Sequence, residues 1–314
     1  MPAPAEVRAT ACCISYSRSV SDAVILACHG TIADLADLEA FLRNVRRGHP
    51  APPELVAEGR RRYEMIGPSP LMATSRRQAE LLEARLEIPC RAAGRLWHPY
   101  PSEVLDELAA LGATRVLSLP LAPQSVHVYH AAVEEAASKL NDMSVIRSPA
   151  WGEEPALIEA FAETIQEALS KLGEVDPAKT VVLLTAHSLP TRVIAAGDPY
   201  EKDFRAMAAR VGDRFASRGL SVEVAFQSQG ASGGPWLGPD FVDVMRQAAS
   251  RGARGVVVAP IGFISEHVET LYDLDVDGAA AAREAGLVYA RAAAVGAREK
   301  VIDALAAVAR RAVG

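Results

Sequence analysis

The segment Val256-Val-Val-Ala-Pro-Ile-Gly-Phe-Ile-Ser-Glu-His-Val-Glu-Thr-Leu-Tyr-Asp-Leu-Asp-Val-Asp277 combines a strand pattern with a helix pattern. Its first four residues are apolar and predict a buried strand, which Pro260 ends. A helix is expected to begin near Ser265, because serine is a good N-cap residue. The segment therefore predicts a strand, a turn and a helix in succession.

Three carboxylates of this expected helix follow one another at intervals of four residues: Glu269, Asp273 and Asp277. On an α-helix they share one face, where like charges repel by roughly 0.2–0.5 kcal/mol per pair. The row, which stands beside His267, therefore needs solvent or cations. A solvated acidic face and a track for metal ions or protons are both open interpretations. Glu266 is expected only to start the helix.

The overall composition is that of a soluble globular protein. The chain has 314 residues, of which 50% are hydrophobic and 23% charged, which is enough for two domains with a sizeable core. A net charge of −6 gives no reason to expect nucleic acid or an anionic membrane as a partner. No apolar run approaches the roughly eighteen residues of a membrane span.

The cysteines favour a reducing compartment. Four are present without CxxC spacing, so neither a disulfide framework nor a zinc site is expected: Cys12, Cys13, Cys28 and Cys90. A cytoplasmic location fits this pattern. Residues 1–20 do not form a convincing signal peptide and are expected to be a disordered tail.

Strand and helix patterns alternate along the chain, which predicts an α/β fold with parallel sheets. Two pairs of segments are also similar to each other. Residues 24–31 resemble 182–189, and 111–123 resemble 251–263, in the same order in both halves. Two similar α/β domains are the simplest explanation of this repeat.

We expect an N-terminal domain over 21–149 and a C-terminal domain over 150–296. The C-terminal helix, 297–313, could pack back on the first domain. Ligands of open α/β sheets bind outside the carboxyl ends of the strands. A cleft between the two domains is therefore the expected site.

Two histidines directly follow apolar strand patterns, His29 after 23–28 and His187 after 180–186. Each is either a histidine tied to its own turn or a metal ligand or base. Glu269 is the natural partner of His187, because one neutral nitrogen and one carboxylate suit a divalent metal that must bind and leave.

A basic group follows in the first domain: Arg46, Arg47 and 60–62, next to Tyr63. Such a group is either a solvated basic face or a receiver of an anionic substrate, since arginine pairs with carboxylates bidentately.

Several motifs resemble the ferrochelatase family. They are Ala186-His-Ser-Leu-Pro190, Gly197-Asp-Pro-Tyr200, Phe226-Gln-Ser-Gln229, Gly234-Pro-Trp-Leu-Gly-Pro239 and Pro260-Ile-Gly-Phe-Ile-Ser-Glu-His-Val-Glu-Thr-Leu-Tyr-Asp273. Others are most similar to the coproporphyrin III ferrochelatases of Gram-positive bacteria: Arg46-Arg-Gly48, Arg62-Tyr-Glu-Met-Ile-Gly67, Ser69-Pro-Leu71, Leu121-Ala-Pro123 and Trp151-Gly-Glu-Glu-Pro155. The resemblance covers about 23–313. It implies two Rossmann-like domains with a porphyrin in the cleft between them.

The resemblance also implies roles for single residues. His187 and Glu269 would be catalytic and would flank the metal, with Asp273 and Asp277 continuing the acidic row. The tetrapyrrole would be held by His29, Arg46, Arg47, Arg62, Tyr63, Ser69 and Tyr129.

The sequence departs from the family pattern in several places. His29 stands where these enzymes usually carry tyrosine, and the loop after 121–123 is shorter, which weakens the assignment of Tyr129. Some ferrochelatases hold a [2Fe–2S] cluster on four cysteines. No cysteine follows Cys90, so no cluster is expected.

The expected reaction is the insertion of Fe²⁺ into coproporphyrin III, giving coprohaem in haem biosynthesis. A neutral His187 would take up pyrrole protons, and Glu269 would receive metal or export protons. Protoporphyrin IX is the alternative substrate. A cobalt or sirohydrochlorin-type chelatase and a non-catalytic tetrapyrrole-binding protein are further alternatives. We expect a monomer that needs no cofactor, with Fe²⁺ and the porphyrin as substrates.

Overall fold

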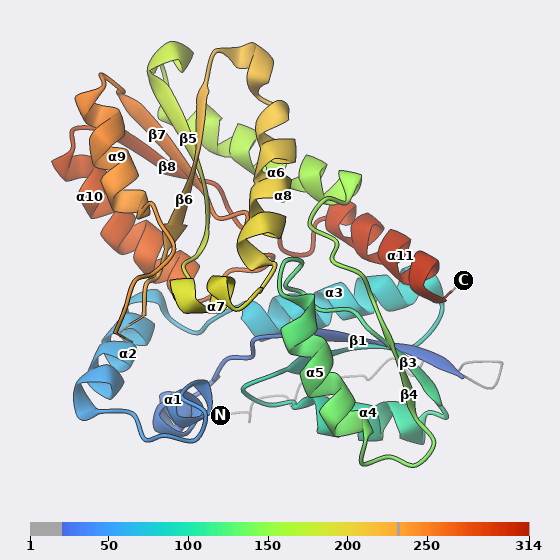
Figure 1. Cartoon of the computed structure of the whole chain (residues 1–314). Helices are drawn as coiled ribbons and strands as arrows, with labels where there is room; N and C mark the ends of the chain where they lie inside the picture. Colours follow the sequence, from blue (N-terminus) through green and yellow to red (C-terminus); the bar gives the residue numbers. More distant parts are fainter. Residues whose placement is uncertain (1–20, 231–232, 314) are drawn as a thin grey trace, which may run out of the picture.

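The computed structural model describes residues 21–230 and 233–313; the expected tail, 1–20, lies outside them. Two parallel four-stranded sheets form its framework (Figure 1). The first sheet has the order β2-β1-β3-β4. Its strands are β1 (Asp22–Cys28), β2 (Cys90–Gly94), β3 (Arg115–Ser118) and β4 (Ser144–Arg147).

The second sheet repeats this arrangement with the order β6-β5-β7-β8. Its strands are β5 (Thr180–His187), β6 (Ser221–Gln227), β7 (Gly255–Ala259) and β8 (Val288–Arg291). The similar segments of the sequence form the equivalent strand pairs, β1 with β5 and β3 with β7. The predicted α/β fold with two similar parallel sheets is confirmed.

Helices connect the strands. In the first half they are α1 (Leu38–Val45), α2 (Pro53–Ile66), α3 (Leu71–Leu86), α4 (Pro101–Ala110) and α5 (Val126–Ala137). The later α-helices are α6 (Pro155–Leu169), α7 (Thr191–Ala195), α8 (Tyr200–Asp213), α9 (Phe241–Ser250), α10 (Ala279–Glu284) and α11 (Glu299–Val313). Short 3-10 turns are η1 (Leu35–Asp37), η2 (Ser170–Leu172), η3 (Pro177–Lys179) and η4 (Ala216–Arg218). No helix of the described residues is long and apolar enough to cross a membrane.

The largest hydrophobic core runs through both halves. It contains Leu26 of β1, Leu184 of β5 and Leu305 of α11, all of which are fully buried. Helix α11 contacts α3 of the first half and α6 at the start of the second (Figure 1). The last helix of the chain therefore joins the two sheets to one another.

The segment after β7 differs from its prediction. No α-helix begins at Ser265; residues 260–267 are turn, bend or irregular, and helical backbone begins at Val268 and continues from Thr270 as η5 (Thr270–Gly278), a π-helix. Gly262 lies so close to β5 that a Cβ there would stand 2.5 Å from the Cβ of Ala186. Near this close crossing Ser265 is buried, and its hydroxyl has no hydrogen-bond partner within residues 21–230 and 233–313.

Glu266 does not start a helix either. Its carboxylate accepts hydrogen bonds from the backbone N–H of Ala294, at 2.8 Å, and from the hydroxyl of Thr270, at 2.7 Å. It also pairs with Arg291 at 2.6 Å. The expected helix-start residue therefore ties the turn to the segment after β8.

Candidate active site

His187 is the last residue of β5, and several hydrogen bonds fix its backbone. The N–H of Ser188 donates to the carbonyl of Gln227 at 2.7 Å, and its hydroxyl donates to the carbonyl of Leu237 at 2.8 Å. The buried hydroxyl of Tyr200 donates to the carbonyl of His187 at 2.9 Å. The end of β6, the segment around Leu237 and helix α8 therefore together set the position of the imidazole.

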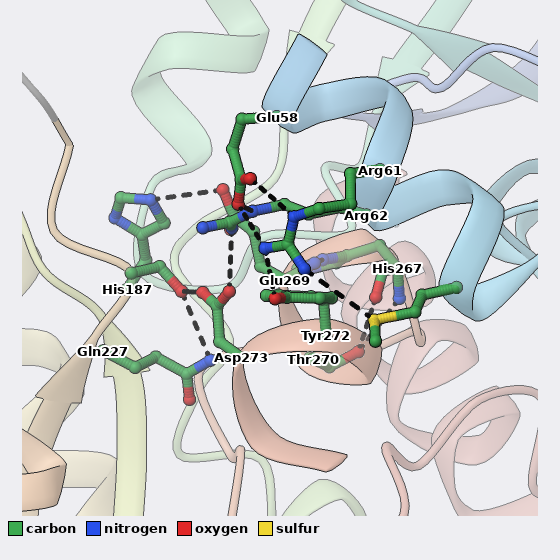
Figure 2. A network of polar contacts seen from close by, with 12 residues as sticks. Glu58, Arg61, Arg62, His187, Gln227, His267, Glu269, Thr270, Tyr272 and Asp273 are labelled. Carbon is green, nitrogen blue, oxygen red and sulfur yellow. Dashed lines mark hydrogen bonds and ion pairs between the residues drawn. The ribbon is translucent and has the colours of Figure 1, made fainter. Parts of the chain in front are cut away.

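The imidazole of His187 faces the carboxylate of Glu269 from the other side of the site (Figure 2). Nε2 and Oε1 are 3.4 Å apart, and the two side chains are 30% and 34% exposed. Nδ1 is already bonded to the carbonyl of Ser188, so it carries a hydrogen. A hydrogen on Nε2 as well, facing the carboxylate, makes the ring an imidazolium.

The electrostatics of this pair agree with its geometry. Burial opposes the charge of His187, but the charge and hydrogen bond of Glu269 outweigh it and raise the pKa of the histidine. Burial likewise opposes the charge of Glu269, but the proximity of His187 lowers the pKa of the carboxyl. The raised pKa of His187 and the lowered pKa of Glu269 both favour the ion pair, whereas the sequence led us to expect a neutral His187 near its ordinary pKa.

Two other histidines lie near Glu269 and stay neutral. The backbone N–H of Glu269 donates to Nδ1 of His267 at 3.1 Å, and burial lowers the pKa of His267. His29 keeps contact with solvent, but protein packed around its ring removes enough water to lower its pKa to about 4. Of these three rings, only His187 favours the charged form.

A polar network joins α2 to the π-helix η5, although these elements come from different halves of the chain (Figure 2). Arg62 binds Asp273 at 2.9 Å and Glu58 at 2.7 Å. Arg61 binds the hydroxyl of Tyr272 at 2.5 Å. Arg62, which was predicted to hold the tetrapyrrole, therefore already has two carboxylate partners.

The predicted acidic row runs from partly buried to exposed positions. Glu269 is partly buried, Asp273 is 7% exposed and Asp277 is exposed. Asp273 is paired with Arg62 and with the hydroxyl of Ser228, so an arginine supplies one of the cations that the row was expected to need. Burial, reinforced by the charge of Glu269, raises the pKa of Asp273 to about 6.

No metal site is assembled from this row alone. Among residues 21–230 and 233–313, no three His, Cys, Asp or Glu side chains are grouped so that they could hold a metal ion. The two predicted metal-facing residues, His187 and Glu269, are close together, and their metal-binding role remains a prediction.

The residues predicted to hold the tetrapyrrole are distributed over the first half. Tyr63 is buried and shares a hydrogen bond of 3.0 Å with Thr31. Tyr129 is buried on α5, close enough to Glu269 for their charges to interact. Ser69 is partly buried just before α3.

Arg46 and Arg47 lie apart from these buried residues. Both are exposed at the end of α1 and have no carboxylate partner among the described residues. Nothing in the structure joins them to His187 or Glu269.

Three contributors to the site were not predicted: Glu58, Tyr200 and Tyr272. The spacing of Glu58 to Arg61 and Arg62, three and four residues along one helix, was a signal that could have indicated their pairing. Tyr200 stands in a motif already noted, Gly197-Asp-Pro-Tyr200, but its contact with the carbonyl of His187 depends on the tertiary fold.

Comparisons with known proteins agree on the family. The Ferrochelatase family model matches residues 21–313. A ferrochelatase of Acidobacterium capsulatum is 34% identical, with 92% of this chain and 93% of the relative covered. Coproporphyrin III ferrochelatases of Anoxybacillus flavithermus and Bacillus subtilis are 34% and 30% identical. The alignments cover 93% of this chain in both cases, and 96% and 97% of the relatives.

Solved structures of other chelatases share the fold. SirB from Bacillus subtilis with Fe³⁺ has a TM-score of 0.58 at 14% identity, covering 94% of this chain and 96% of SirB. CbiX, the terminal enzyme for siroheme biosynthesis in denitrifying bacteria, has a TM-score of 0.55 at 17% identity, covering 93% and 99%. At this identity the likeness concerns the fold alone. The family match over 21–313 and the relatives above 30% identity decide the assignment: the chain belongs to the ferrochelatase family of porphyrin metal chelatases, which are lyases.

Proposed function

We propose that this ferrochelatase inserts Fe²⁺ into coproporphyrin III and releases coprohaem. The observation that supports this substrate most directly is that five of the relatives at 30–34% identity are named for coproporphyrin III. Coproporphyrin carries four propionates and protoporphyrin two, so the larger number of anions requires additional cations. The exposed arginines Arg46 and Arg47, which have no carboxylate partner in the described part of the chain, are the candidates to bind the additional propionates.

We further propose that His187 and Glu269 handle the metal and the protons. Fe²⁺ bound at Glu269 would neutralise the carboxylate that keeps His187 protonated. His187 would then release its proton and become a base for a pyrrole N–H. Insertion removes two pyrrole protons as one Fe²⁺ enters, so charge is balanced when both protons leave the site.

The rest of the acidic row suits the export of those protons. Asp273, with a pKa of about 6, can both accept and release a proton near neutral pH. Asp277, one turn further along η5, is exposed to solvent. In this proposal the row from Glu269 to Asp277 connects the site with bulk water.

The substrate proposal is tested by anaerobic Fe²⁺ insertion into coproporphyrin III and protoporphyrin IX, measured side by side. The wild-type protein should favour coproporphyrin in kcat/KM. The double variant Arg46→Gln, Arg47→Gln should lose roughly tenfold on coproporphyrin, since one weakened charged contact of about 1.4 kcal/mol corresponds to that factor. Its loss on protoporphyrin should be smaller.

A matched control removes an exposed arginine far from these helices. Arg254 lies just before β7, at the amino-terminal end of that strand, and is exposed. Arg254→Gln should leave both reactions unchanged. Equal losses on both porphyrins in the double variant would contradict the substrate proposal and favour protoporphyrin IX, the alternative.

We also propose that the enzyme acts as a cytoplasmic monomer without an iron–sulfur cluster. Cys28 and Cys90 are buried, free thiols, and burial raises the pKa of each. Such thiols are poorly suited to ligate a cluster, which requires thiolates. Assays of iron and acid-labile sulfide in the purified protein test for the cluster. Sedimentation of the protein tests whether it is a monomer.

A further inference from the structure

Arg95 directly follows β2, at the carboxyl end of the first sheet. Its backbone N–H donates to the carbonyl of Cys28 at 2.8 Å, and the N–H of Leu96 donates to the carbonyl of His29 at 2.9 Å. These bonds fix Arg95 beside the strand end that presents His29. The guanidinium is close enough to His29 for its charge to help lower the pKa of that ring.

Arg95 differs from every other partly buried arginine of the described residues. The remaining arginines that are not exposed all bind carboxylates: Arg62 with Asp273 at 2.9 Å, Arg91 with Glu83 at 2.5 Å, Arg291 with Glu266 at 2.6 Å and Arg298 with Glu167 at 2.7 Å. No carboxylate within 21–230 or 233–313 pairs with Arg95, and its buried Nε has no hydrogen-bond partner.

The side chain of Arg95 packs against an aromatic ring and not against an anion. Its guanidinium carbon lies 5.7 Å from the ring centre of Tyr129 on α5. Burial raises the pKa of Tyr129 to about 12, so its hydroxyl stays neutral and provides no counter-charge. A guanidinium that is partly withdrawn from water without a counter-charge is costly, which indicates a binding site for an anion.

We propose that Arg95 binds one carboxylate of the porphyrin substrate, on the His29 side of the active site, with the hydroxyl of Tyr129 as a second donor. This inference rests on the proposed function only in taking a carboxylate-bearing porphyrin as the substrate. Arginine presents two parallel N–H groups to a carboxylate, so it fixes direction as well as charge. Arg95 thereby determines which propionate-bearing edge of the ring lies deepest in the site.

The test uses fluorescence to measure the binding of metal-free porphyrins. It compares the wild type with the variants Arg95→Gln and Arg95→Lys. The probes are coproporphyrin III, protoporphyrin IX and mesoporphyrin dimethyl ester, which has no free carboxylate. Arg95→Gln should weaken binding of both free acids by roughly ten- to hundredfold, the range for a lost charged hydrogen bond, and leave the ester unaffected. Arg95→Lys should retain part of the affinity, because lysine keeps the positive charge but lacks the two parallel N–H donors of arginine.

Thermal unfolding of the metal-free and porphyrin-free variants separates binding from a structural role. Removing a charge without a counter-ion should leave the Tm of Arg95→Gln unchanged or raised, and Arg254→Gln serves as the surface control. Wild-type affinity of Arg95→Gln for both free acids, or an equal loss for acids and ester accompanied by a lower Tm, would overturn the inference. Loss of coproporphyrin preference alone would contradict the substrate proposal and leave the role of Arg95 intact.

Discussion

The two halves of the molecule share one strand order but differ in the groups that they present at the same places. His29 follows β1 and His187 ends β5, which are equivalent strands. Tyr129 and Glu269 also correspond, since each stands eighteen residues after the start of its repeated segment, 111–123 or 251–263. The first half therefore presents a histidine and a phenol at these positions, and the second presents a histidine and a carboxylate.

In the function that we propose, this difference corresponds to the two tasks of a chelatase, porphyrin binding and metal transfer. In the first half the pKa of His29 is lowered and that of Tyr129 raised, so both groups are neutral at pH 7. In the second half His187 and Glu269 stabilise each other as ions. Neutral groups and arginines suit the binding of an organic anion, whereas an ion pair that can exchange its cation suits metal and proton transfer.

The largest effect is expected from Glu269→Gln, which removes the charge and keeps the shape. We expect kcat to fall by about 10²–10⁴, the range for loss of acid–base catalysis, with little change in porphyrin affinity. Tyr129→Phe, at the equivalent position, should lower kcat much less. Single-turnover insertion and metal-free porphyrin titration measure the two quantities. A larger loss of affinity than of kcat in Glu269→Gln would make Glu269 a porphyrin-binding residue.

A second test replaces, one at a time, the histidines at the ends of the two equivalent strands. His187→Gln should lower kcat by about 10²-fold or more, because no base remains beside the ion site. His29→Gln, its counterpart, should change kcat by less than about tenfold, since a neutral ring takes no part in the charge transfer that we propose. Equal losses in the two variants, measured at saturating porphyrin, would contradict the division of tasks between the halves.

The third prediction concerns the pH dependence of stability. The pKa of Asp273 is about 6 in the folded protein and close to 3.8 in the unfolded chain. The folded state therefore holds more protons between these values, and its stability falls as the pH rises from about 4 to 6. The expected change is about 1–3 kcal/mol.

Asp273→Asn, which does not titrate, should flatten this part of the curve. The matched control is Asp277→Asn, because Asp277 is exposed on the same helix. Denaturant unfolding at several pH values measures the effect. An unchanged curve in Asp273→Asn would mean that another group causes the pH dependence.

The smallest effect is expected where the halves are joined through α2 and η5. Arg62→Gln removes the cation beside the buried carboxylate of Asp273. Because the side chain of Arg62 is 32% exposed, we expect a moderate destabilisation of about 1–2 kcal/mol. Arg60→Gln, an exposed neighbour on the same helix, should be neutral in chemical denaturation. Equal stability of the two variants would show that this contact contributes nothing to the folded state.

Much of the fold could be predicted because its signals are local. Continuous apolar runs such as 23–28 and 180–186 are typical of buried parallel strands, and the repeat predicted two similar sheets. The sequence also predicted that His187 and Glu269 lie close together, because the carboxyl ends of neighbouring parallel strands meet at one edge of the sheet.

The errors arose where distant segments decide the local structure. Nothing near Ser265 indicates that Gly262 packs on Ala186, and the helix begins at Val268, three residues later than expected. The pairing of Arg62 with Asp273 joins residues 211 positions apart, beyond the range of any spacing argument. The raised pKa of His187 likewise depends on Glu269, which lies in the segment after β7.

The core that passes through α11 has a consequence for how substrate enters. Since Leu26, Leu184 and Leu305 belong to one buried cluster, the two sheets share a single cooperative unit of stability. A hinge motion that separates the two sheets would expose that cluster to water and cost much of the folding free energy. Exchange of substrate and product is therefore expected to depend on local opening of the contact between α2 and η5, with hydrogen exchange faster there than in β1 or β5.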